Sequence, residues 1–176
     1  LHRTASLAQL ASSFSLSVSD VAARLDSIRA TLFNRREQRV RPSLDDKILS
    51  DWNGLMMAAL SKAARILPEA EYGAAAKRAA DFILDRMVLH ENRLLHLWRQ
   101  RRAGVPGNAD DYAFLIWGLL ELYETVFDVR YLRVAKGLQD TMLKQFWDTD
   151  GGGFFFTAHD AEALPARLKT VMDGAL

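Results

Sequence analysis

The sequence contains no cysteine among its 176 residues. A chain without cysteine has no disulfide framework, no thiol nucleophile and no cysteine ligands for zinc. This composition fits a reducing compartment, so a cytoplasmic location is expected. The four histidines, at positions 2, 90, 96 and 159, share no ligand-like spacing. We therefore expect no bound metal and no cofactor.

Charge of one sign and long apolar runs are also missing. Lys and Arg total 23 against 22 for Asp and Glu, and a net charge of +1 creates no field that would attract nucleic acid or an anionic membrane. No apolar run approaches the roughly 20 residues that span a bilayer. The first residues do not resemble a signal peptide. With 49% hydrophobic residues, however, the chain can bury a substantial core.

A short motif recurs along the chain at nearly even spacing. Each copy places a Ser, Asn or Thr three positions before an aspartate, and the aspartates lie 65 and then 62 residues apart. The copies end at Asp46, Asp111 and Asp173. This spacing is typical of a capping box at the start of a helix. The recurrence predicts an array of repeats that begin near residues 43, 108 and 170.

The spacing of apolar residues predicts the elements between these motifs. We expect helices near 6–13, 17–39, 45–67, 69–89, 112–123 and 129–147, extended segments at 94–98 and 154–157, and a charged loop at 99–108. Residues 112–123 are apolar nearly all round, which predicts a buried helix, whereas 129–147 is amphipathic. A second correspondence, at a shift of 59, pairs Tyr72 with Tyr131 and Leu95 with Phe154.

Buried helices that alternate with amphipathic ones predict two concentric helical layers. The predicted fold is all-α: part of an α/α toroid, about two and a half helical hairpins with short β-like arms. Residues 1–40 would form a helical lead-in and 41–176 the partial toroid. The chain begins at Leu1 and stops as a third repeat opens, which indicates one excised domain of a larger protein. An incomplete ring exposes inner faces, so self-association of the chain is expected.

Four segments carry a resemblance to a known family. Residues 41–55, RPSLDDKILSDWNGL, closely resemble a signature of the YyaL and spermatogenesis-associated protein 20 family, and 110–116, 151–157 and 169–175 resemble further signatures. The resemblance implies a thioredoxin-like domain upstream, followed by a six-hairpin toroid similar to glycosidases and N-acylglucosamine epimerases. Ser43 stands where the family often has histidine.

The repeated aspartates are the first candidates for chemistry. In such a toroid Asp46, Asp111 and Asp173 would ring the central depression, with Asp45 and Asp110 beside them as substrate contacts. Two carboxylates that flank a bond are what glycoside hydrolysis requires. The same aspartates can instead serve as helix caps. Accepted N–H bonds and the helix dipole are expected to lower the pKa of each carboxyl, which favours a base, nucleophile or sugar ligand over a general acid.

Three further residues are candidate substrate contacts. His96 lies on the extended arm beside the predicted mouth, and Trp98 could stack on a sugar ring. Tyr112 either lines the depression or packs between inner helices. Trp52 and Trp117 share one helical phase, which favours core packing over sugar stacking.

Two functions remain open at this point. The first is carbohydrate binding or processing, glycoside hydrolase-like or sugar-epimerase-like and incomplete within this chain, although an epimerase would be expected to place histidines where this sequence has none. The second is a non-catalytic helical scaffold that supports a thioredoxin-like domain. The first predicts aspartates that face an open pocket, and the second predicts carboxylates occupied by cap N–H groups.

Overall fold

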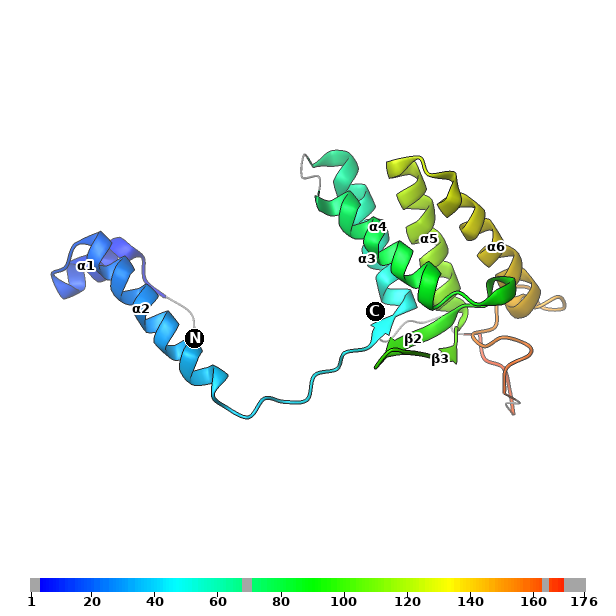
Figure 1. The fold of residues 1–176 in the computed structure, drawn as a ribbon, viewed down its shortest axis with the longest axis horizontal. Coiled ribbons are helices and arrows are strands. Elements are labelled where there is room, and N and C mark those ends of the chain that lie inside the picture. The colour runs from blue at the N-terminus through cyan, green and yellow to red at the C-terminus, as the bar shows by residue number, and fades with distance from the viewer. Residues whose placement is uncertain (1–3, 68–70, 163–164, 170–176) are drawn as a thin grey trace. The chain divides into compact units, whose positions relative to one another are not determined.

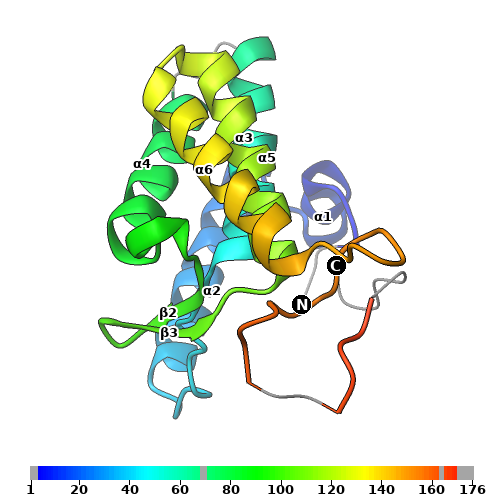
Figure 2. The same cartoon turned by 90° about the vertical axis from the view of Figure 1, so that its right-hand side faces the viewer.

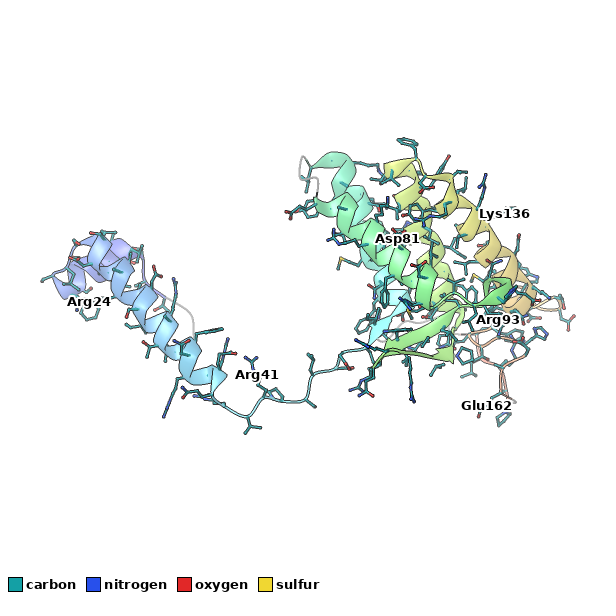
Figure 3. All side chains as sticks on the ribbon, viewed as in Figure 1. Arg24, Arg41, Asp81, Arg93, Lys136 and Glu162 are labelled. Carbon is teal, nitrogen blue, oxygen red and sulfur yellow. The ribbon has the colours of Figure 1, made fainter. Side chains whose placement is uncertain are left out.

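The computed structural model describes residues 4–67, 71–162 and 165–169. The chain forms two compact units, Leu1–Asp45 and Asp46–Leu176. Figure 3 shows the described side chains, with Arg24 and Arg41 in the first unit and Asp81 and Arg93 in the second. Each unit is described by itself.

The first unit consists of α1 (Leu7–Phe14) and α2 (Val18–Glu37). Ser6 caps α1 in a capping box with Gln9, and the side chain of Ser17 accepts a hydrogen bond from the Asp20 N–H at the start of α2. Both helices agree with the sequence prediction. Ile28 and Leu32 of α2 are 52% exposed, so the second half of this helix lacks an apolar cover within the described part of the unit.

The second unit is built from helical hairpins. Its helices are α3 (Ser50–Ile66), α4 (Glu71–Arg86), α5 (Ala109–Val126) and α6 (Val129–Phe146). Figure 1 shows α3 and α5 side by side, with α4 packed on α3 and α6 packed on α5. The predicted two layers are therefore present, with α3 and α5 forming one layer and α4 and α6 the other.

A small antiparallel sheet closes one end of the helices. It contains β1 (Ile48–Leu49), β2 (Leu95–Arg99) and β3 (Arg102–Pro106) in that order, after a 3-10 turn η1 (His90–Asn92). Figure 2 shows the β2–β3 hairpin at the end of the bundle where α3 and α5 begin. The sequence predicted β2 but assigned residues 99–108 to a loop. That assignment was wrong because β3 is an exposed, charged edge strand, which carries little apolar alternation.

The core lies between the two helical layers. Leu115, Leu119 and Leu122 of α5 are fully buried, as the apolar segment predicted. The amphipathic helix α6 buries Tyr131 and Phe146 against them, which its pattern also predicted. No helix among the described residues is both long and apolar enough to cross a membrane.

The repeat has a period of 59 residues, not 65. The helices α3 and α5 begin at Ser50 and Ala109, and the isolated bridge between Val88 and Leu94 has its counterpart in Trp147 and Phe154. Ile48 pairs with Trp98 in the sheet, so the backbone is still extended where a helix was predicted. The shift of 59 that related Tyr72 to Tyr131 is the structural one.

The first predicted capping box is consequently absent. Residues 41–47 are not helical, and the N-cap of α3 is Leu49, without a side-chain cap bond. Asp46 therefore precedes α3 instead of lying in its first turn. The second motif does cap its helix: the Asp111 carboxylate accepts a hydrogen bond from the Asn108 N–H at 2.8 Å. The third, Thr170 to Asp173, lies outside the described residues.

Two tryptophans depart from the predicted packing. Trp52 is 57% exposed and Trp117 is 43% exposed, so neither is a core residue. Trp52 lies two residues, or about 200° around the helix, from Gly54, which contacts α5. Trp117 lies one residue, about 100°, from Gly118, which contacts α3. Both rings therefore lie off the contact between the two inner helices.

Candidate functional site

Asp111 is the centre of the polar cluster where α3 and α5 begin. Its residue exposure is 1%, and it is the third residue of α5. Oδ2 accepts a hydrogen bond from the Asn108 N–H at 2.8 Å, and Oδ1 accepts one from the Asp51 N–H at 3.2 Å. His96 Nδ1 lies 2.9 Å from Oδ1 and 3.1 Å from Oδ2. One carboxylate thus joins α5, α3 and β2.

The local sequence explains why these groups meet. The first N–H groups of an α-helix have no partner within the helix, and a carboxylate is favoured there by the helix dipole. Asp111 satisfies such groups at the starts of two helices. Ser50, the first residue of α3, donates from Oγ to the Leu95 carbonyl oxygen at 2.6 Å. That bond fixes the start of α3 on β2 and places the Asp51 N–H next to Asp111.

His96 is the exposed member of the cluster. Its side chain is 27% exposed, whereas that of Asp111 is 2% exposed. Because an ionised carboxylate only accepts hydrogen bonds, the neutral imidazole carries its proton on Nδ1. Within the described part of the chain, no hydrogen bond involves its Nε2. The cluster therefore presents one imidazole nitrogen with a lone pair.

The electrostatics of Asp111 differ from the expectation. Burial raises the pKa of the Asp111 carboxyl above its ordinary value, although the hydrogen bonds from His96 and Asn108 lower it. The predicted lowering was therefore wrong for this residue. The expectation considered the N–H bonds and the dipole but not the almost complete burial, which disfavours the charged form. Both oxygens are occupied by N–H groups, so the carboxylate is a hydrogen-bond acceptor within the fold.

The other predicted aspartates lie elsewhere. Asp46 pairs with Arg99 of β2, with 2.6 Å between Oδ1 and Nε, and both side chains are nearly half exposed. Asp45 is exposed at the end of the first unit, and Asp110 is exposed in the first turn of α5. Asp173 lies outside the described residues. The structure brings His96 to Asp111 and gives Asp46 a different partner.

Both predicted aromatic contacts pack inside the fold. Tyr112 is 1% exposed, its hydroxyl accepts a hydrogen bond from the Leu94 N–H at 2.9 Å, and its ring lies 5.2 Å from that of Phe146. Burial raises the pKa of the Tyr112 hydroxyl. Trp98 meets Phe82 edge-on, with ring centroids 5.7 Å apart. Of the two roles open for Tyr112, packing between helices is the one observed.

Among the described residues, Asp51, His96 and Asp111 are those that could approach one metal ion. Each offers a ligand atom, and the three atoms lie within 4.8 Å of one another. The Asp111 oxygens already accept two backbone N–H bonds and the imidazole contact. A cation would have to compete with these bonds, so the geometry is that of a hydrogen-bonded junction.

Sequence reasoning missed Asp51 and the backbone of Asn108. Asp51 occupies the second helical position of α3, as Asp110 does in α5. The shift of 59 aligns these two residues, so that shift carried the signal. The more conspicuous shift of 65 aligned Asp46 with Asp111 and concealed it.

No family model matches the chain. Spermatogenesis-associated protein 20 from Homo sapiens is 36% identical over 180 residues, which cover 97% of this chain. This chain is a homologue of spermatogenesis-associated protein 20. The resemblance drawn from the signature at residues 41–55 is thereby confirmed. The chain spans about a quarter of the relative's length, 23%.

Solved structures show the same fold. A cellobiose 2-epimerase from Spirochaeta thermophila matches 62% of this chain and 28% of its own, with a TM-score of 0.58 and 15% identity. A GH76 α-mannanase from Bacteroides thetaiotaomicron matches 66% of this chain and 33% of its own, with a TM-score of 0.59 and 18% identity. The predicted fold, part of a six-hairpin glycosidase-like α/α toroid, is confirmed. The three-stranded sheet is an addition to the all-α prediction.

Proposed function

We propose that this homologue of spermatogenesis-associated protein 20 forms part of a carbohydrate-binding or carbohydrate-processing toroid. The ligand would meet His96 at the end of the bundle where α3 and α5 begin. The observation that carries the proposal is the imidazole held on its Nδ1 side by the buried Asp111 carboxylate and partly exposed otherwise.

The chemistry of the cluster suits a neutral, hydroxyl-rich ligand. A bare Nε2 accepts a hydrogen bond from an O–H group, and ligand sites commonly combine a few such placed polar groups with apolar surroundings. The structural neighbours are named as a cellobiose 2-epimerase and an α-mannanase, and both names denote action on sugars. At 15–18% identity these names support a substrate class and no particular substrate.

The proposal changes the roles first given to the aspartates. Asp111 supports the site and does not contact the sugar, because its oxygens are occupied. Asp46 keeps a proposed role in ligand binding, beside its partner Arg99, since its side chain is 46% exposed. The proposed roles of Asp45 and Asp110 as further ligand contacts, and of Asp173 as a carboxylate in the depression, are likewise kept.

A longer protein context is part of the proposal. The relatives extend well beyond the region that matches this chain, which covers 22–24% of their length. The family resemblance implies a thioredoxin-like domain upstream of the toroid. We infer that such a domain accompanies this toroid and that further hairpins complete the ring.

A second function is favoured by one specific observation. The Asp111 carboxylate is buried and accepts backbone N–H bonds at the starts of α3 and α5. That is the arrangement expected of a non-catalytic helical scaffold that supports the thioredoxin-like domain. The two functions differ in whether His96 meets a ligand.

A titration with sugars distinguishes them. We expect cellobiose or mannose to shift the imidazole signals of His96 in a saturable way, as observed by NMR of the chain labelled at histidine. Replacement His96→Gln should abolish the binding, whereas His90→Gln, at an exposed residue of η1, should preserve it. Unshifted His96 signals at saturating sugar would favour the scaffold.

A further inference from the structure

The orientation of His96 has a defined chemical consequence. Its Nδ1 lies within hydrogen-bond distance of both oxygens of Asp111, at 2.9 and 3.1 Å. Asp111 is itself fixed by the Asp51 and Asn108 N–H groups. The carboxylate therefore cannot turn away from the imidazole without leaving two backbone donors unsatisfied.

We propose that Asp111 is a positioning residue that holds His96 in its Nδ1–H tautomer, so that Nε2 serves as a general base toward a hydroxyl of a bound sugar. The nature of the ligand rests on the function proposed above. The tautomer does not, because it follows from contacts within the chain.

The step that this arrangement supports is a simple proton transfer. The hydroxyl proton moves to Nε2, and the bonding electron pair stays on the sugar oxygen. The ring then carries a positive charge, which the Asp111 carboxylate at 2.9 Å stabilises. The imidazolium returns the proton from Nε2 when the oxygen is protonated again, so the cluster ends as it began.

A second carboxylate lies near the same imidazole. Asp51 offers an oxygen within 4.8 Å of the ligand atoms of His96 and Asp111. Two negative groups near one ring favour its protonated form over the neutral form. Asp51 also supplies the N–H bond that fixes Asp111. The residue thus supports the base through its charge and through its backbone.

The tautomer is directly measurable. In the chain labelled with ¹⁵N-histidine, a long-range ¹H–¹⁵N correlation spectrum distinguishes a protonated ring nitrogen from a bare one, and His96→Gln identifies the His96 signals by their loss. We expect the neutral ring of the unmodified chain to carry its proton on Nδ1. In Asp111→Asn the amide NH₂ can donate to Nδ1, so the Nδ1–H tautomer should be lost in favour of Nε2–H.

Each result decides the proposal. An Nε2–H ring in the unmodified chain overturns it, as does an unchanged tautomer in a folded Asp111→Asn chain. If circular dichroism shows that Asp111→Asn does not fold, the spectrum of the unmodified chain decides alone. Asp140→Asn, at an exposed residue of α6, is the matched control and should leave the His96 spectrum unchanged. A confirmed tautomer whose ring ignores added sugar would reject the sugar and retain the positioning role.

Discussion

Gly54 of α3 and Gly118 of α5 bring the two inner helices into backbone contact. A Cβ added to Gly54 would lie 2.4 Å from the Phe114 carbonyl carbon, and one added to Gly118 would lie 2.6 Å from the Gly54 oxygen. Such distances leave no room for a methyl group. The close crossing also lies only three residues from Asp51, so it helps to bring the Asp51 N–H within reach of Asp111.

Replacement Gly54→Ala should therefore destabilise the second unit. The added methyl group would force the helices apart, and overpacking of this kind typically costs about 1–3 kcal/mol. The free energy of unfolding in urea measures the loss. Gly104→Ala is the control, because a Cβ at Gly104 meets nothing within 4 Å. Equal stability of the two variants would show that α3 and α5 do not cross at Gly54.

Asp111 and Asp46 should differ sharply when each is replaced by alanine. Asp111→Ala leaves two backbone N–H groups and an imidazole without their buried acceptor, at about 1–3 kcal/mol for each unsatisfied group. Asp46→Ala removes a half-exposed pair with Arg99, which is worth about 0–1 kcal/mol. Urea unfolding of both variants compares them. A loss at Asp46 as large as that at Asp111 would contradict the period of 59 residues.

The Tyr112 hydroxyl should contribute to stability through the Leu94 backbone. Tyr112→Phe keeps the ring against Phe146 but removes the acceptor of the buried Leu94 N–H. Leaving that donor unsatisfied should cost about 1–3 kcal/mol. Thermal unfolding measures the change, with Tyr72→Phe, at a partly buried ring, as the control. If the two variants melted alike, the hydroxyl would have no structural role.

Glu121 should make the contact between α3 and α5 sensitive to acid. Burial raises the pKa of this carboxyl, but hydrogen bonds from Arg65, Trp117 and Lys62 outweigh burial and hold the pKa at about 2, against an ordinary 4.5. Because the folded pKa is the lower one, the stabilisation is complete above pH 4.5 and is lost as the pH falls toward 2.

The measurement is urea unfolding at a series of pH values. Between pH 5 and 2, Glu121→Gln should lose less stability than the unmodified chain, because the variant has no carboxylate to protonate. Glu124→Gln is the control on the same helix, at a side chain that is 66% exposed. Parallel pH curves for Glu121→Gln and the unmodified chain would exclude this role for Glu121.

The helices and their layers were predictable because apolar spacing records which faces are buried. The buried α5 and the amphipathic α6 followed directly from this pattern. The start of α3 did not, because Ile48 and Leu49 pair with β2 and keep the backbone extended through residues that resemble a helix start. Strand pairing with a distant segment leaves no local signal, so the Ser43–Asp46 motif was given the wrong role.

The site was predictable in its members and not in its arrangement. Asp111 and His96 were both candidates, one from a repeated motif and one from its place on an extended arm. Their contact depends on the return of β2 beside the start of α5, which spacing along the chain does not encode. The direction of the Asp111 pKa shift depended on burial, and burial of a first-turn aspartate is set by its neighbours in three dimensions.

The central claim is that one carboxylate, that of Asp111, joins the starts of α3 and α5. Native-state hydrogen exchange of the Asp51 and Asn108 amides tests it most directly, because both N–H groups donate to Asp111. We predict slow exchange of both amides in the unmodified chain and faster exchange of both in Asp111→Asn, with the amides in the middle of α6 unchanged. Fast exchange of either amide in the unmodified chain, or equal protection in the variant, would contradict the claim.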